Sequence, residues 1–226
     1  MRLVLTAVII CGFCAAARAQ ESVLDRRIKA DAAGAAVVWL PDGISDGMFA
    51  WRVAESASVP LIFEALPPEY RDPSTVVERV DLDGLTVRRA LDILVAREPR
   101  YRWEDRDGVI VIRPGRFTND PDDRLNQRVA AVQRKRLGLQ DVLAGVTATA
   151  NGGGASPTLL PAIDSRQFAM DAPGGTVLDV LVAAARAHGR VMWSMPDSVT
   201  GGDSDRFSLG YRTFADDAGT AGVAAR

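Results

Sequence analysis

The chain has 226 residues and a formal net charge of −2, with 27 lysine and arginine residues against 29 acidic ones. This mildly acidic balance, with no basic run longer than Arg134-Lys135-Arg136, argues against nucleic acid as a partner. The length suits two small domains and not one large one.

The first 19 residues have the pattern of a secretory signal peptide. Arg2 is followed by an apolar run and then by small residues that end at Ala19, so we expect cleavage before Gln20 and a periplasmic or secreted product. The apolar run is shorter than the roughly 20 residues that a transmembrane helix needs, and no later segment approaches that length. We therefore expect no membrane span after cleavage.

Both cysteines of the chain, Cys11 and Cys14, lie within this segment. The mature chain would contain no cysteine, so it can have no disulfide framework and must be held together by its core. The sequence leaves open whether either cysteine carries a lipid.

Residues 20–117 are expected to form a first domain. The expected elements, in order, are a strand at 36–40, a helix at about 46–58, strands at 61–63 and 76–82, a helix from Thr86 to Pro99, and a hairpin of 101–103 with 109–112. The second helix is the clearest, because Thr86 suits an N-cap and apolar residues recur after it at helical spacing. Asp107-Gly108 is a typical hairpin turn.

Residues 118–124 are polar and turn-rich and are expected to be a linker, and residues 125–214 a second domain. There we expect a strand at 128–133, a helix at 139–150, a strand at 167–171, a helix from Thr176 to Gly189, and a hairpin of 191–193 with 207–211. Gly189 is placed to end its helix in a left-handed conformation. The tail, 215–226, is expected to be disordered.

Two stretches of the chain repeat each other at an offset of 90 residues, Gly84–Trp103 and Gly174–Trp193. Each contains a turn glycine, a helix-capping threonine, an apolar helix face and a strand that ends in tryptophan. Repetition of one supersecondary unit predicts two copies of one small domain. The expected class is α+β: two tandem modules, each a mixed sheet with two packed helices in the order β-α-β-β-α-β-β.

Three segments of the first copy, Val59–Phe63, Val80–Leu94 and Asp107–Pro114, carry a family resemblance. They resemble the short N-terminal domain (STN) shared by secretins and TonB-dependent receptors, which has an apolar strand, a glycine before a helix with Ala-Leu, and a last strand that ends in Arg-Pro. The second copy matches only in Gly175–Trp193 and lacks the Ala-Leu pair and the Arg-Pro ending. No barrel or ring segment follows, so the family's gating role does not carry over.

The resemblance implies a non-enzymatic interaction module of the cell envelope. Its partner would be another envelope protein, such as a secretion channel, a receptor or a regulator, docked on a sheet edge or a helical surface. The partner's identity and the oligomeric state stay open. The alternative is a small-molecule or glycan binder that uses a groove between the two copies and the tryptophans Trp39, Trp51, Trp103 and Trp193.

We expect no catalytic, cofactor-binding or metal-binding residues. His188 is the only histidine, which excludes a histidine-based triad or a multi-histidine metal site, and its place near a helix end suits a structural role. The glycines of Asn151–Gly154 follow a helix, whereas a phosphate-binding loop precedes one. Two acidic groups lack the glycine and glutamate of a calcium loop and are expected to be solvated: Asp120, Asp122 and Asp123, and Asp203 with Asp205.

Overall fold

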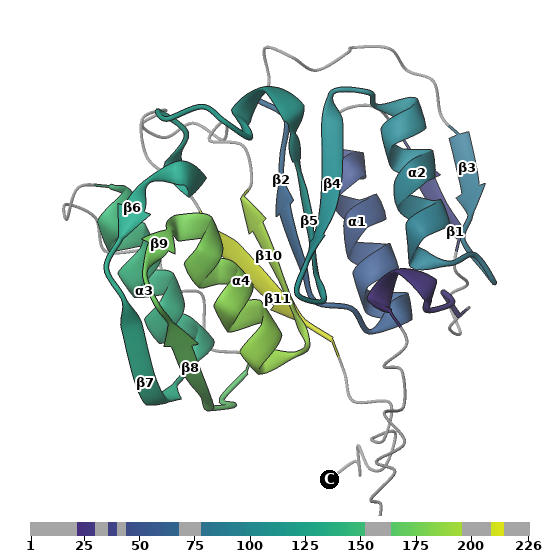
Figure 1. The fold of residues 1–226 in the computed structure, drawn as a ribbon. Helices are drawn as coiled ribbons and strands as arrows, with labels where there is room; N and C mark the ends of the chain where they lie inside the picture. The colour runs from purple at the N-terminus through teal and green to yellow at the C-terminus, as the bar shows by residue number, and fades with distance from the viewer. Residues whose placement is uncertain are drawn as a thin grey trace, which may run out of the picture.

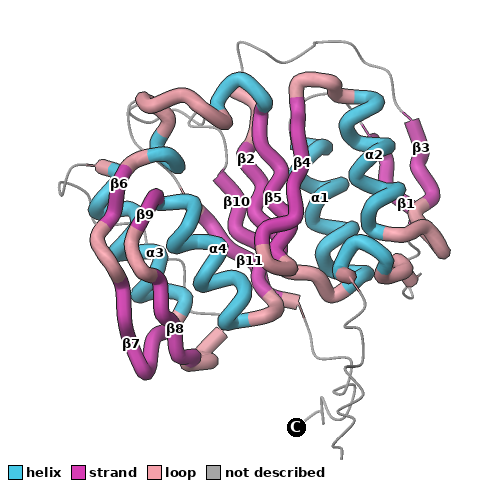
Figure 2. The backbone as a smooth tube through the Cα atoms, in the orientation of Figure 1, coloured by secondary structure: helices cyan, strands magenta, loops and turns pink. Residues whose placement is uncertain are grey.

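The computed structural model describes residues 22–29, 36–39, 44–67, 78–151, 164–195 and 209–214. A central sheet has a pair of helices on each face (Figure 1). One two-stranded sheet lies beyond the helix pair of the first half, and two further two-stranded sheets lie beside the helix pair of the second half. Figure 2 shows the same alternation of strands and helices along the backbone.

The first half of the chain follows the predicted order of elements. They are β1 (Ala36–Trp39), α1 (Ile44–Ala57), β2 (Leu61–Glu64), β3 (Glu78–Asp81), α2 (Val87–Arg97), β4 (Tyr101–Arg106) and β5 (Val109–Pro114), after a short 3-10 helix, η1 (Val23–Asp25). Thr86 caps α2, because its side chain accepts a hydrogen bond from the N–H of Arg89.

Two 3-10 helices, η3 (Gly115–Phe117) and η4 (Arg124–Asn126), bracket the predicted linker. The second half then contains β6 (Arg128–Val129), β7 (Val132–Leu137), α3 (Leu139–Ala150), β8 (Phe168–Ala172), β9 (Gly175–Thr176), α4 (Val177–His188), β10 (Val191–Met195) and β11 (Gly210–Thr213). The strand expected at 128–133 is divided into β6 and β7. Gly189 ends α4 with φ of +81°, as predicted.

The central sheet contains strands from both halves in the order β11-β10-β2-β5-β4. The strands β10, β2 and β5 are parallel to one another, and β4 and β11 run antiparallel at the two edges. The α+β class with a mixed sheet is thus confirmed. The structure differs from the predicted separate sheet in each module, because β10 of the second half pairs directly with β2 of the first.

Both faces of the shared sheet are buried, and this explains why the halves combine. Phe63, Ile110 and Ile112 pack with α1 and α2 in one hydrophobic cluster. Their neighbours Ile62 and Val111 point to the opposite face and pack with α3 and α4 in a second cluster. If the first half stood alone, this second face would be exposed to water. The exposure would cost about 25 cal/mol of free energy for each Å² of apolar area.

The repeat places its two tryptophans in different strand positions of this one sheet. Trp103 lies on the edge strand β4 and packs against the cluster of α1 and α2, whereas Trp193 lies on the inner strand β10 and belongs to the cluster of α3 and α4. Each tryptophan therefore faces the helices of its own half. The two hairpins join the sheet differently. β2 pairs with β5, the second strand of the first hairpin, and with β10, the first strand of the second hairpin.

The predicted signal peptide and the tail at 215–226 lie outside the described residues. Among the residues that are described, no helix has the length and apolar character needed to cross a bilayer.

Candidate functional site

The outer edge of β4 is the longest regular strand edge that the described residues leave unpaired. All six residues of β4 pair with β5 without a register shift, and no described strand lies on the other side of β4. The edge of β7 is equally long but interrupted by a bulge between Arg134 and Leu137, and it carries three exposed cations. Exposed charges also lie on β4, at Arg102, Glu104 and Asp105, so the charges do not separate the two edges. The bulge does, because it breaks the regular ladder that an added strand would continue, and β4 is therefore the edge better suited to strand addition.

The register of the hairpin shows which main-chain groups of β4 point outward. The N–H of Gly115 donates to the carbonyl of Arg100 at 2.7 Å, one step beyond the pair of Tyr101 with Pro114. Because hydrogen-bonded pairs alternate along an antiparallel ladder, Arg102, Glu104 and Arg106 bond to β5. The N–H and C=O groups of Trp103 and Asp105 therefore face away from β5, toward the free edge.

The side chains of β4 divide between the two faces of the sheet. Trp103 is half-buried on the α2 side, and the guanidinium of Arg88 lies 5.8 Å from its ring centre. Asp105 is exposed, and its carboxylate accepts the N–H of Gly108 at 2.8 Å, which supports the hairpin turn. On the opposite face Arg106 donates to Glu104 at 2.5 Å.

Two cavities lie along this second face of β4, where the two halves meet. The larger, of about 310 Å³, is bounded by Arg106, the segment 118–121 and the start of α4. The smaller, of about 130 Å³, lies over Val111 between Arg102 and Glu104. Thr118 lines both, so the two cavities are neighbours, and together they are called the groove beside the edge strand.

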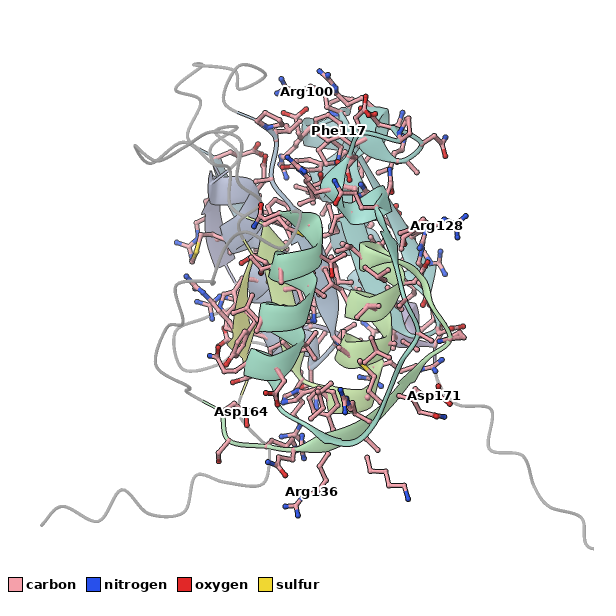
Figure 3. All side chains as sticks on the ribbon, turned by 90° about the vertical axis from the view of Figure 1, so that its left-hand side faces the viewer. Arg100, Phe117, Arg128, Arg136, Asp164 and Asp171 are labelled. Carbon is pink, nitrogen blue, oxygen red and sulfur yellow. The ribbon has the colours of Figure 1, made fainter. Side chains whose placement is uncertain are left out.

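A buried ion cluster holds the wall of this groove in place. Arg113 is buried near the end of β5, and its guanidinium donates to Glu64 and to Asp123, each at 2.6 Å, and to Asn126 at 3.1 Å. Asn126 in turn donates to the carbonyls of Phe117 and Asp120. The predicted linker is therefore fixed to the ends of β2 and β5. Figure 3 shows Phe117 and Arg100 together at this end of the molecule.

The cluster contains one cation for two carboxylates, and the pKa of one of these carboxylates is shifted. Burial raises the pKa of Glu64 to about 8, since desolvation outweighs the attraction of Arg113 and the nearby Asp123 adds repulsion. Glu64 therefore holds its proton to a higher pH than an ordinary glutamate does. A buried titratable group can mark an active site, but every strong donor here is already bound within the protein, so the cluster is structural.

His188 lies near the opposite end, where Figure 3 places its partner Asp164. Its ring is buried, Nδ1 accepts the N–H of Arg190 at 3.3 Å, and Nε2 lies 3.0 Å from a carboxylate oxygen of Asp164. Since Nδ1 is the acceptor, Nε2 carries the proton and donates it to Asp164. Burial lowers the pKa of His188. These contacts fit the structural role expected from the sequence.

The other candidate residues are not brought together. Asp123 is bound to Arg113, Asp120 accepts the N–H of Asp122, and Asp203 and Asp205 lie outside the described residues. No group of three or more His, Cys, Asp or Glu side chains within the described ranges could hold a metal ion. Asn151 ends α3, and the glycines at 152–154 also lie outside the described part.

The three tryptophans whose side chains the structure describes do not line a common groove. Trp193 is completely buried, and Trp51 is half-buried on α1 beneath Arg212, on the other face of the sheet from Trp193. Trp103 borders only the smaller cavity. The side chain of Trp39 is outside the described set.

The sequence reasoning missed the Arg113 cluster, having noted Arg113 only as part of the Arg-Pro ending. A signal was present, because a single arginine lies near the end of an otherwise apolar strand and is followed by Asp123 in the linker and by Asn126 just after it. A buried cation of this kind requires carboxylate or carbonyl partners. Comparisons of the chain with protein-family models, with curated proteins and with solved structures find no match.

Proposed function

We propose that this chain is an exported, non-enzymatic protein of the cell envelope that binds an extended segment of another envelope protein along the free edge of β4. The observation that supports this best is the regular edge itself, with the main-chain groups of Trp103 and Asp105 directed outward. An added strand would form hydrogen bonds with both residues. Each such bond contributes about 0.5–1.5 kcal/mol net, and side-chain contacts would add selectivity.

The export component of the proposal depends on the signal-like residues 1–19, and the envelope partner on the resemblance to the STN domain. The regular pairing of β4 favours it over β7 as the binding edge within the same molecule, since a bulge interrupts β7.

Site-directed photocrosslinking in the host cell tests the proposal. A benzophenone side chain at Glu104 should crosslink to an extended segment of an envelope protein, which mass spectrometry can map. The matched control carries the same group at Lys135, on the bulged edge of β7, and should give no such product. Absence of a crosslink from position 104, or equal products from both positions, would contradict binding at β4.

A second candidate function is the binding of a small polar molecule or glycan in the groove. The cavity of about 310 Å³ beside α4 favours it, because this volume reaches the lower end of the usual range of about 300–1,000 Å³ for ligand sites. Titration with saccharides or peptidoglycan fragments separates the two functions. A groove ligand would shift the NMR signals of Asn126 and Leu178, and a strand at the edge would shift those of Trp103 and Asp105.

A further inference from the structure

The chemistry of the β4 edge indicates what kind of strand it would accept, an inference that rests on the proposed function. A strand added to an edge places its residues directly opposite those of the edge, with Cβ atoms about 4.5–5.5 Å apart and on the same face of the sheet. Trp103 and Asp105 point to the α2 side, so the residues opposite them would also lie there and be separated by one residue.

Trp103 offers an aromatic surface to such a strand. It is half-buried, packs against the core on one side, and Arg88 covers its ring from α2 at 5.8 Å. Aromatic and β-branched side chains pair favourably with an aromatic residue across strands. The position opposite Trp103 therefore suits isoleucine, valine or an aromatic residue.

Asp105 offers a carboxylate that is not paired with a cation of the described residues. Within the described part of the chain it accepts one hydrogen bond, from the main chain of Gly108, and its side chain is exposed. The nearest cation in sequence, Arg106, points to the other face and is bound to Glu104 and to Asp179. A lysine or arginine opposite Asp105 would therefore find an acceptor that is still free to bind it.

We propose that β4 selects strands in which an apolar β-branched or aromatic residue and a basic residue are separated by one position. The apolar residue lies against Trp103, and the basic residue lies against Asp105. A parallel or an antiparallel strand satisfies this spacing, with the order apolar-x-basic in one case and basic-x-apolar in the other. The class of ligand is thus an extended segment with a cationic residue, and not an acidic one.

Four capped threonine-rich octapeptides test this selection against the full chain by NMR titration and amide hydrogen exchange. Two contain Ile-x-Lys and Lys-x-Ile, and the other two replace lysine with glutamate. We expect one lysine peptide to protect the amides of Trp103 and Asp105 and to bind about tenfold more tightly than its glutamate counterpart, because opposite charges attract and like charges repel across strands.

Two variants identify the residue responsible. Asp105→Asn keeps an acceptor for the hairpin turn and removes the charge, so it should reduce the preference for lysine to about threefold or less. Asp92→Asn, an exposed carboxylate on α2, is the matched control and should leave the preference unchanged. Methylation of the peptide nitrogens that face β4 should abolish binding, since strand addition needs these donors.

The outcomes separate the two proposals. If both charge forms protect Trp103 and Asp105 equally, β4 binds strands but the selection is overturned. If no peptide protects these amides, strand addition at β4 is overturned as well. Self-association of the chain through β4 that the peptides do not displace would also overturn the selection, because the occupant would then be a second copy.

Discussion

Arg113 shows how a single residue can join distant parts of the chain. Its guanidinium binds Glu64 at the end of β2 and Asp123 in the linker, and Asn126 adds a fourth side chain to the cluster. Removing one member of a buried ion pair is usually severe, at about 3–5 kcal/mol, because the remaining charge is left without a partner. The cluster therefore helps to fix where the second half begins.

The protonation of Glu64 gives the cluster a measurable pH dependence. Its pKa in the folded protein is about 8, against an ordinary value of 4.5. The folded state therefore binds more protons between these values, so the stability from this carboxyl is complete below pH 4.5 and is lost as the pH rises to about 8. Glu64→Gln keeps the shape of the side chain and removes this titration.

We expect the free energy of unfolding of the unsubstituted protein to fall between about pH 5 and about pH 8.5 by about 1–4 kcal/mol more than that of the Glu64→Gln variant. Urea denaturation at the two pH values measures the difference. Glu55→Gln, which changes a half-exposed carboxylate on α1, is the control and should behave like the unsubstituted protein. The same fall in the Glu64→Gln variant would mean that another group is responsible.

At the scale of elements, the helices were predictable because their signals are local. Thr86 and Thr176 each precede an apolar stripe, and each side chain accepts a hydrogen bond from the third residue that follows it. The hairpin turn was also predicted, from the Asp107-Gly108 dipeptide, and it is confirmed, since both residues adopt positive φ. These features need no knowledge of the rest of the chain.

The shared sheet was not predicted, because strand partners depend on surfaces far apart in sequence. The runs Leu61–Phe63 and Val109–Ile112 are apolar at every position, which is typical of strands covered on both faces. A module with helices on one face of its sheet would expose half of these side chains. The runs therefore indicated a second covering layer, although they could not show that α3 and α4 supply it.

The free edge of β4 could not be predicted from the sequence either. The expectation of docking on a strand edge did not name a strand, because the order of strands decides which one is outermost. The groove beside it also depends on the fold, since Arg106, Thr118 and Asp179 are separated in sequence.

The two capping threonines lead to a prediction about the helices. Thr86→Ala and Thr176→Ala should each lower the free energy of unfolding by about 1 kcal/mol, because each leaves a helix N–H without its acceptor. The helices lie in different layers, so the double variant should lose the sum. The control is Thr149→Ala in α3, whose hydroxyl donates to the carbonyl of Gly145 within the helix and should matter little. If only one of the two substitutions lowered the free energy of unfolding, the expectation that both threonines stabilise their helices equally would be wrong.

At the scale of the whole molecule, the repeats form one structure joined by a sheet. The pairing of β10 with β2 is supported by ion pairs between the β4–β5 hairpin and α4, which join Arg106 to Asp179 and Arg186 to Asp107. These ion pairs are exposed and contribute little energy. The continuous sheet and its two buried faces instead couple the halves, so they should unfold together.

Fluorine NMR of the chain labelled with 5-fluorotryptophan tests this coupling most directly. Trp103 reports on the first half and Trp193 on the second, and single substitutions assign their signals. In one urea titration both native signals should disappear with the same midpoint. Loss of β10 and α4 would leave the edge of β2 unpaired and would expose the face of β2 and β5 that α4 covers. Two clearly separated urea midpoints for Trp103 and Trp193 would contradict the coupling of the halves through the shared sheet. They would mean that the two halves unfold as independent modules.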